Sequence, residues 1–237
     1  MTSGPLLAFD TATTVAVAAI GAPDGRLLAE TAWTAGYRHG EELLARVDAL
    51  LVDARVELAA VGGIVVGTGP GAFTGLRVGL ATAKGLAHGL GVPIVGIPTR
   101  TAVLAAAALV DPTRAAFALL LPAGPSDRLF IEPDGRTTVL AGTPVGAGSD
   151  DDAARLADLA AGRTLVAVDL DGRAPEAAVD LGSRARVGLA AALLALGSAE
   201  LAAGRPSDLA ELVPDYVTLP RGVHQETGAV GWSRDPA

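Results

Sequence analysis

The sequence predicts an α/β protein of two lobes, in which strands and helices alternate along most of the chain. Near the N-terminus, short apolar segments are separated by turn residues, which is typical of an antiparallel meander. Further on, apolar residues recur at strand spacing and helix spacing in turn, as they do in folds with parallel strands. The length of 237 residues and the hydrophobic content of 50% suffice for one large domain or two small lobes.

Three strands are predicted first. Residues 6–10 and 15–20 are apolar runs joined by a Thr-rich turn after Asp10, which predicts a hairpin. The following Ala-Pro-Asp-Gly turn contains a proline with a fixed φ and a glycine that tolerates a positive φ. Residues 26–33 are therefore expected to return as a third antiparallel strand.

Alternating helices and strands are predicted next. Residues 40–55 form an amphipathic helix whose own core face is expected to consist of Leu43, Leu44, Val47, Leu50 and Leu51. The next elements expected are a strand at 63–67, the loop Gly-Thr-Gly-Pro-Gly-Ala-Phe, a helix at 74–90, a strand at 92–97 and a helix at 99–110.

The second half shows weaker patterns. Strands are expected at 115–121, 128–132 and 164–169, and a long Ala/Leu helix at 187–203. Segments rich in Gly, Pro and charge are expected to be loops: 122–127, 142–152 and the residues after 220. The predicted division is a first lobe at 1–98, a smaller second lobe at 99–219 and a tail at 220–237.

Composition excludes several classes of protein. The longest uncharged run, 58–76, contains two glycine-rich stretches that would break a membrane helix, and the N-terminus lacks the basic region of a signal peptide, so a cytoplasmic protein is expected. The absence of cysteine excludes disulfides and zinc-thiolate sites. A net charge of −8 argues against a broad nucleic-acid surface, so any RNA contact should be indirect.

Three motifs carry a resemblance to a known family. They are LLAFDTATTVAVAAI from Leu6, YRHGEELLARVDALL from Tyr37 and GTGPGAFTGLRVGLATAKGLA from Gly67, with a weaker match at ELVPDYV, residues 211–217. In this order and spacing they resemble the TsaB (YeaZ) family. The element order is also that of one lobe of the actin, Hsp70 and sugar-kinase superfamily. The resemblance therefore implies a two-lobed actin/Hsp70/sugar-kinase-like (ASKHA, RNase H-like) fold.

The resemblance also implies a function. TsaB proteins are dimerisation subunits that pair with a TsaD-like catalytic subunit and, with a TsaE-like ATPase, support threonylcarbamoyl transfer to the adenosine beside the anticodon of tRNA. It implies a homodimer when the chain is alone, only indirect contact with tRNA and no membrane association. No cofactor is expected: ATP is used by the complex, and whether this chain binds it stays open.

No catalytic or metal-binding residue is predicted for this chain. The catalytic relatives hold metal through a His-x-x-x-His pair on the first helix, a spacing that places two imidazoles on one helix face. Here the residue four positions after His39 is Leu43, and the other two histidines lie on different predicted elements. An ordinary histidine at a helix start is therefore expected.

A vestigial nucleotide site is a candidate at Asp10, Thr11, Gly69 and Gly71. In superfamily nucleotide binders this region provides an acidic group for a cation and hydroxyls for phosphate, although Asp followed by Thr at a strand end is also an ordinary turn. A dinucleotide-binding loop is disfavoured because Pro70 removes an amide donor and the following strand ends without an acidic residue. A nucleotide-dependent kinase or hydrolase of the same superfamily stays open as the alternative function.

Small residues on the first two helices are the candidate partner interface. Ala45, Ala49 and Val52 form a second, smaller face of the first helix, and Gly75, Gly79 and Ala83 recur one turn apart on the second helix. Small side chains allow another helix to approach closely. Packing of the second series on the chain's own core is the alternative, and the sequence does not decide between them.

Overall fold

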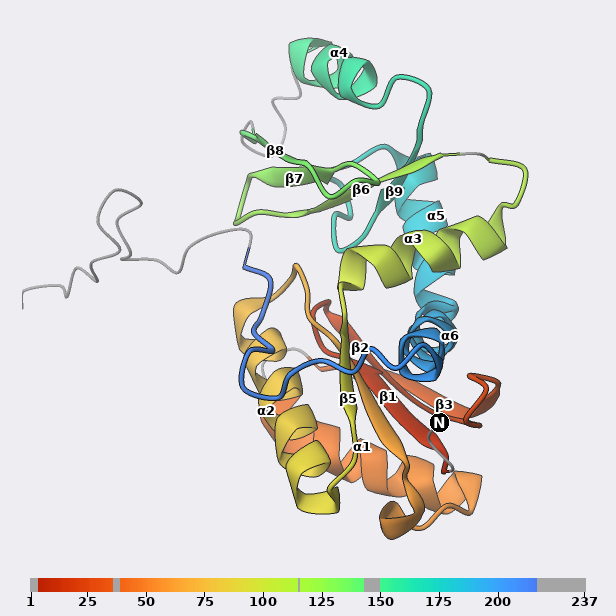
Figure 1. Ribbon diagram of the computed structural model, residues 1–237. Helices are drawn as coiled ribbons and strands as arrows, with labels where there is room; N and C mark the ends of the chain where they lie inside the picture. The colour runs from red at the N-terminus through yellow and green to blue at the C-terminus, as the bar shows by residue number, and fades with distance from the viewer. Residues whose placement is uncertain (1–3, 36–38, 115, 143–149, 217–237) are drawn as a thin grey trace, which may run out of the picture.

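A computed structural model describes residues 4–35, 39–114, 116–142 and 150–216, with the backbone alone at 39–41 and 150–152. The chain forms two lobes, each built on its own sheet (Figure 1). No single described helix is long and apolar enough to cross a membrane. The consecutive helices Glu176–Val187 and Leu189–Ala202, which meet at a bend of 59°, reach that length and apolar content only together.

The first lobe contains a five-stranded sheet in the order β3-β2-β1-β4-β5. Its strands β1, β2 and β3 are antiparallel, and β4 and β5 continue parallel to β1. Their bounds are Leu6–Asp10, Val15–Gly21, Leu27–Thr34, Gly63–Gly67 and Ile94–Ile97. Every residue of β1 and β4 is buried, because helices cover both faces of the sheet at its centre.

Three helices cover the first sheet. The helices α1 (His39–Ala54) and α2 (Phe73–Leu90) contact each other and pack on one face. On the other face lies α6 (Leu189–Ala202), an almost wholly apolar core helix that contacts β1, β2, β4 and β5. A short 3-10 turn, η1 (Leu58–Ala60), precedes β4.

The second lobe contains a four-stranded sheet in the order β8-β7-β6-β9. The strands are β6 (Phe117–Pro122), β7 (Arg128–Ile131), β8 (Thr137–Leu140) and β9 (Thr164–Ala167). The helices α3 (Thr99–Val110) and α5 (Glu176–Val187) lie between the two sheets, and α4 (Asp150–Leu159) lies on the outer side (Figure 1).

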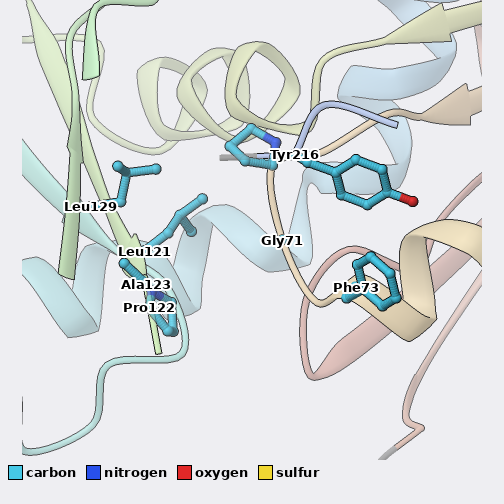
Figure 2. Close-up of a pocket in the computed structure, with 8 residues that line it drawn as sticks. Gly71, Phe73, Leu121, Pro122, Ala123, Leu129 and Tyr216 are labelled. Carbon is cyan, nitrogen blue, oxygen red and sulfur yellow. The ribbon is translucent and has the colours of Figure 1, made fainter. Parts of the chain in front are cut away.

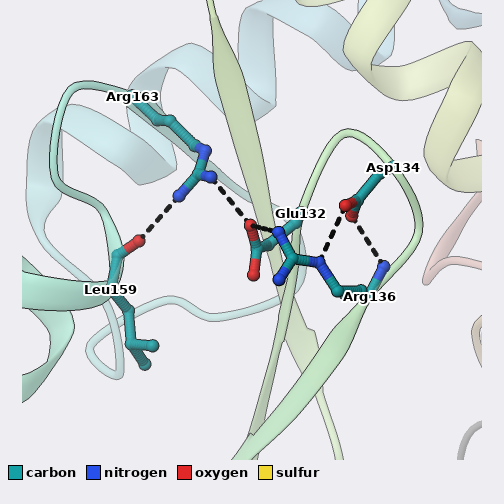
Figure 3. Close-up of polar contacts among 5 residues, drawn as sticks. All are labelled: Glu132, Asp134, Arg136, Leu159 and Arg163. Carbon is teal, nitrogen blue, oxygen red and sulfur yellow. Dashed lines mark hydrogen bonds and ion pairs between the residues drawn. The ribbon is translucent and has the colours of Figure 1, made fainter.

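An ion network joins two turns of the second lobe. Glu132 accepts hydrogen bonds from Arg136 at 3.0 Å and Arg163 at 2.7 Å, and Arg136 also pairs with Asp134 (Figure 3). Arg163 in addition donates to the Leu159 carbonyl at 3.1 Å. These contacts fix the β7–β8 turn against the segment between α4 and β9.

The C-terminal strap, which we define as residues 205–216, returns to the first lobe. Its Ser207 N–H donates to the Ile94 carbonyl at 2.8 Å, and the Gly96 N–H donates to Ser207 Oγ at 3.0 Å. Lys84 of α2 donates to the Ala210 carbonyl at 3.3 Å. The strap therefore lies along the outer edge of β5. Like α6, it packs on the first sheet although it follows the second lobe in sequence.

The structure confirms the predicted strands and helices of the first lobe and corrects several predictions in detail. The elements that were missed are β8, α4 and α5, and the predicted helix at 187–203 begins at Leu189 after a break at Gly188. Leu44, expected in the core, is 54% exposed, so α1 buries one residue fewer than its pattern suggests.

Candidate functional site

Asp10 lies at the end of β1, where the first sheet meets the start of α3. Its side chain is buried, and both carboxyl oxygens accept hydrogen bonds. The Ala12 N–H donates to Oδ1 at 2.7 Å, and Thr99 Oγ1 donates to Oδ2 at 2.6 Å. Thr99 Oγ1 in turn accepts the Gly69 N–H at 2.9 Å. Asp10 therefore joins β1, the loop after β4 and the first residue of α3.

Gly67 makes this arrangement possible. A Cβ atom at position 67 would lie 1.9 Å from Asp10 Oδ2, so any other residue would displace the carboxyl group. Gly69 has a φ of +101°, which favours glycine, and its carbonyl accepts the Thr99 N–H at 2.7 Å. The glycines of this loop serve contacts within the chain.

Burial raises the pKa of Asp10, while hydrogen bonds from Thr99 and from the Ala12 N–H act in the opposite direction. Asp10 forms no ion pair with any residue that the structure describes. Among those residues, no three His, Asp or Glu side chains are grouped so that they could hold a metal ion.

The threonines after Asp10 donate to acceptors of the protein itself. Thr11 Oγ1 donates to the Gly75 carbonyl at 2.7 Å, and Thr13 Oγ1 donates to the Val15 carbonyl at 2.7 Å. Thr14 donates to Asp169 of the second lobe. At Gly71, a Cβ atom would lie 2.1 Å from the Ala12 carbonyl oxygen, so the two loops are in close contact. The four residues of the candidate nucleotide site are thus used in packing the β1–β2 turn against α2 and α3.

A pocket of about 70 Å³ lies between the two lobes, beside the hydrogen bonds of the β1–β2 turn. Its lining comes from the loop before α2, from β6 and β7, and from the end of the C-terminal strap (Figure 2). The Phe73 and Tyr216 rings lie 5.2 Å apart on one side, while Leu121 and Leu129 form the other side. Arg77 stacks 3.8 Å from the Phe73 ring centre and donates to the Tyr216 hydroxyl at 2.9 Å.

The candidate interface residues fall into two groups. Gly75, Gly79 and Ala83 are on the buried side of α2, where a Cβ atom at Gly79 would lie 2.3 Å from Thr11 Oγ1. This series packs on the chain's own core. Ala45, Ala49 and Val52 are exposed on α1, and Val52 is 70% exposed.

The exposed side of α2 lies elsewhere on the helix. Its exposed residues include Thr74, Arg77, Ala81, Gly85 and His88. A Cβ atom added at Gly85 would meet no atom of the chain within 4 Å. Residues of this face were not among the candidates because the sequence alone could not tell which small residues α2 turns inward.

Two predictions fall outside the described part of the chain. One concerns the side chain of His39, and the other the tail predicted at 220–237. Conversely, the structure adds Thr99, Asp169 and Arg186 to the sites where the lobes meet. The positions of these residues in the sequence give no local signal, since each partner is far away along the chain.

Comparison with known proteins places this sequence beside proteins of tRNA threonylcarbamoyladenosine biosynthesis. The family model of TsaD, tRNA N6-adenosine threonylcarbamoyltransferase, matches residues 33–203. A Mycobacterium leprae protein is 44% identical over 95 residues, which is 39% of this chain and 26% of that protein. The TsaB protein of Haemophilus influenzae, a tRNA threonylcarbamoyladenosine biosynthesis protein, is 39% identical over 69 residues, 29% of each chain.

A solved structure agrees over most of the chain. YeaZ from Pseudomonas aeruginosa is 25% identical with a TM-score of 0.61, covering 90% of this chain and 100% of that one. This likeness confirms the predicted two-lobed fold and the resemblance to TsaB and YeaZ. The matches span less than half of the length of the first curated relatives. Because the family model covers well over half of this chain, the chain belongs to the TsaD family of tRNA N6-adenosine threonylcarbamoyltransferase proteins.

Proposed function

We propose that this chain is the non-catalytic subunit that pairs with a TsaD-like catalytic subunit for threonylcarbamoyl transfer to the adenosine beside the anticodon of tRNA. The observation that carries the pairing is the exposed apolar face of α1. Leu44 is 54% exposed and Val52 is 70% exposed, and exposed Ala45 and Ala49 lie beside them, with Asp48 as the charged residue of this face. A soluble helix normally turns such residues toward a core, so a covering partner is expected.

The exposed side of the neighbouring helix α2 is also suited to binding a partner helix. Gly85 lies in the interior of an exposed helix face, where a glycine costs about 1 kcal/mol relative to alanine. Nothing within the described chain requires a glycine there. Together with exposed Ala81, Gly85 allows a partner helix to approach closely. Since α1 and α2 contact each other (Figure 1), we define their exposed residues Leu44, Ala45, Ala49, Val52, Ala81 and Gly85 as the α1–α2 face.

Two observations support the scaffold role: the described function of the relatives and the hydrogen bonds that Asp10 accepts. Relatives with the TsaB name are tRNA threonylcarbamoyladenosine biosynthesis proteins. Both oxygens of Asp10 are occupied by donors of the chain, which supports a structural role for that carboxyl group. We further propose that the chain is cytoplasmic, forms a homodimer when alone, works with a TsaE-like ATPase and contacts tRNA only through its partners.

An enzyme assay tests the scaffold role. The purified chain should hydrolyse ATP no faster than the buffer background, whereas the mixture with TsaD-like and TsaE-like proteins should modify tRNA. ATP turnover by the chain alone, at the rate of the assembled mixture, would contradict the scaffold role and favour a kinase or hydrolase.

The α1–α2 face is tested with Ala49→Trp. A bulky side chain at an exposed position should leave the melting temperature unchanged but hold the partner helix away. We expect affinity for a TsaD-like chain to fall at least about ten-fold, equivalent to about 1.4 kcal/mol, in a calorimetric titration. Ala177→Trp, at an exposed alanine of α5, is the matched control and should bind normally. Equal affinity of both variants and the parent chain would remove the α1–α2 face from the interface.

A further inference from the structure

Arg77 lies on the side of α2 that belongs to the α1–α2 face. Arg77, Ala81 and Gly85 follow one another at intervals of four residues, a spacing that places side chains above one another on one side of a helix. All three residues are exposed. A partner helix that covers Ala81 and Gly85 therefore also meets the charged side chain of Arg77.

Two aromatic residues hold the Arg77 guanidinium in place. Its Cζ atom lies 3.8 Å from the centre of the Phe73 ring and 5.9 Å from the centre of the Tyr216 ring, and its Nε donates to the Tyr216 hydroxyl at 2.9 Å. The Tyr216 hydroxyl points away from Leu121 and Leu129 on the other side of the pocket (Figure 2). Stacking and a hydrogen bond thus restrict a side chain that otherwise has many rotamers.

The end of the C-terminal strap that carries Tyr216 is itself fixed to the chain. The Asp215 N–H donates to the Thr68 carbonyl at 2.7 Å, and the Asp215 carboxylate pairs with Arg100 of α3. The aromatic support of Arg77 is therefore part of the folded chain and is in place before any partner binds.

The outer part of the Arg77 guanidinium keeps free donors. Nε is used by Tyr216, whereas the two Nη groups have no acceptor and no ion pair among residues 4–35, 39–114, 116–142 and 150–216. An apolar partner surface over these N–H groups would remove them from water without replacing their hydrogen bonds, which weakens binding. A carboxylate suits them, because its two oxygens match the planar fork of a guanidinium.

We propose that Arg77 is an anchor of the interface at the α1–α2 face and binds a carboxylate of the TsaD-like partner, beside the small residues of α2. This inference rests on the proposed function, since it names a contact of the same surface. Arginine and tyrosine often dominate the binding energy of interfaces, and a side chain that is ordered beforehand loses less entropy on association. Tyr216 is a positioning residue, which holds Arg77 with its Nη groups free for the partner.

The first test is Arg77→Met in the full chain. Methionine keeps a long unbranched side chain and removes the charge and the donors, so the partner carboxylate loses its counterpart. We expect affinity for the TsaD-like chain of the same organism to fall at least about ten-fold in a calorimetric titration. Added salt should weaken binding of the parent chain more than binding of Arg77→Met, because only the parent forms the charged contact.

Two variants serve as controls for Arg77→Met. Arg155→Met makes the same change at an exposed arginine of α4 and should bind like the parent chain. Arg77→Lys keeps the charge but not the planar fork, so it should recover part of the lost affinity. Equal melting temperatures of the variants and the parent chain establish that all of them are folded.

Tyr216→Phe tests the positioning role. Phenylalanine keeps the ring and removes the hydroxyl that accepts the Arg77 Nε–H. Affinity should fall about three-fold or more in the parent background but not in the Arg77→Met background, where no guanidinium is left to position. An equal loss in both backgrounds would overturn the positioning role.

Ala49→Trp separates failure of this inference from failure of the proposed function. If Ala49→Trp weakens binding while Arg77→Met binds as well as the parent chain, the partner covers the α1–α2 face without a carboxylate at Arg77, and the anchor is overturned. If neither change affects affinity, the α1–α2 face is not the interface, and the proposed pairing surface fails together with the anchor.

Discussion

Gly79→Leu is expected to destabilise the chain strongly, whereas Gly85→Leu on the same helix should not. A Cβ atom at Gly79 would lie 2.3 Å from Thr11 Oγ1, which itself donates to the Gly75 carbonyl at 2.7 Å. Leucine would overpack this site and break a buried hydrogen bond. Overpacking typically costs about 1–3 kcal/mol, and an unsatisfied buried polar group costs a similar amount.

The combined loss for Gly79→Leu should therefore be on the order of 3 kcal/mol, which lowers the melting temperature of a chain of this size by roughly 10 °C. Gly85→Leu is the matched control, since its Cβ would meet open space. Helix propensity alone should raise its stability by up to about 1 kcal/mol. Thermal unfolding of both variants checks the pair. Equal stability of Gly79→Leu and the parent chain would show that this face of α2 is not packed as described.

Asp10→Ala should cost on the order of 3 kcal/mol, whereas Asp10→Asn should leave stability at neutral pH unchanged or higher. Alanine leaves the Ala12 N–H and the Thr99 hydroxyl without their acceptor in a buried place. Asparagine keeps an oxygen for the Ala12 N–H and removes the buried negative charge. Urea unfolding at neutral pH measures both variants.

The pH dependence of the same variants gives an independent measurement. Because burial raises the pKa of Asp10, the folded state holds this proton more tightly than the unfolded chain. Its contribution to stability is fully present below the unfolded pKa and is lost as pH rises through the raised folded pKa. The free energy of unfolding of the parent chain, relative to that of Asp10→Asn, should therefore fall as pH rises. If the difference in free energy of unfolding between the parent chain and Asp10→Asn stays constant as pH rises from below the unfolded pKa to neutral pH, the pKa of Asp10 is not raised.

The first lobe could be predicted from the sequence because its signals are local. The Ala-Pro-Asp-Gly turn and the apolar runs beside it fix a meander, and the Gly-rich loop separates β4 from α2. In the second lobe, β8 is four residues long and has only Leu140 buried. The helix α5 buries only four of its twelve residues, three of them Ala or Gly, and carries four charged residues, so its apolar stripe is weak.

The candidate site could be predicted only in part, because its contacts are long-range. Asp10 could be singled out at the end of its strand, but Thr99, its hydrogen-bond partner, lies 89 positions away. The sequence also could not decide whether the small residues of α2 face a partner or the chain's own core. Part of what covers α2 comes from distant residues of this chain, since Leu209 and Leu212 of the C-terminal strap pack against the same core as Leu80 and Ala83.

The C-terminal strap also sets the order in which the molecule can be completed during synthesis. The edge of β5 is capped by Ser207, and one face of the first sheet is covered by α6, both of which are translated after the whole second lobe. While the chain is still on the ribosome, the first lobe therefore has an open strand edge and an uncovered apolar face. Such surfaces favour strand pairing with other chains. Only the later synthesis of α6 and the C-terminal strap covers these surfaces, so the first lobe is made before the second lobe but is completed after it.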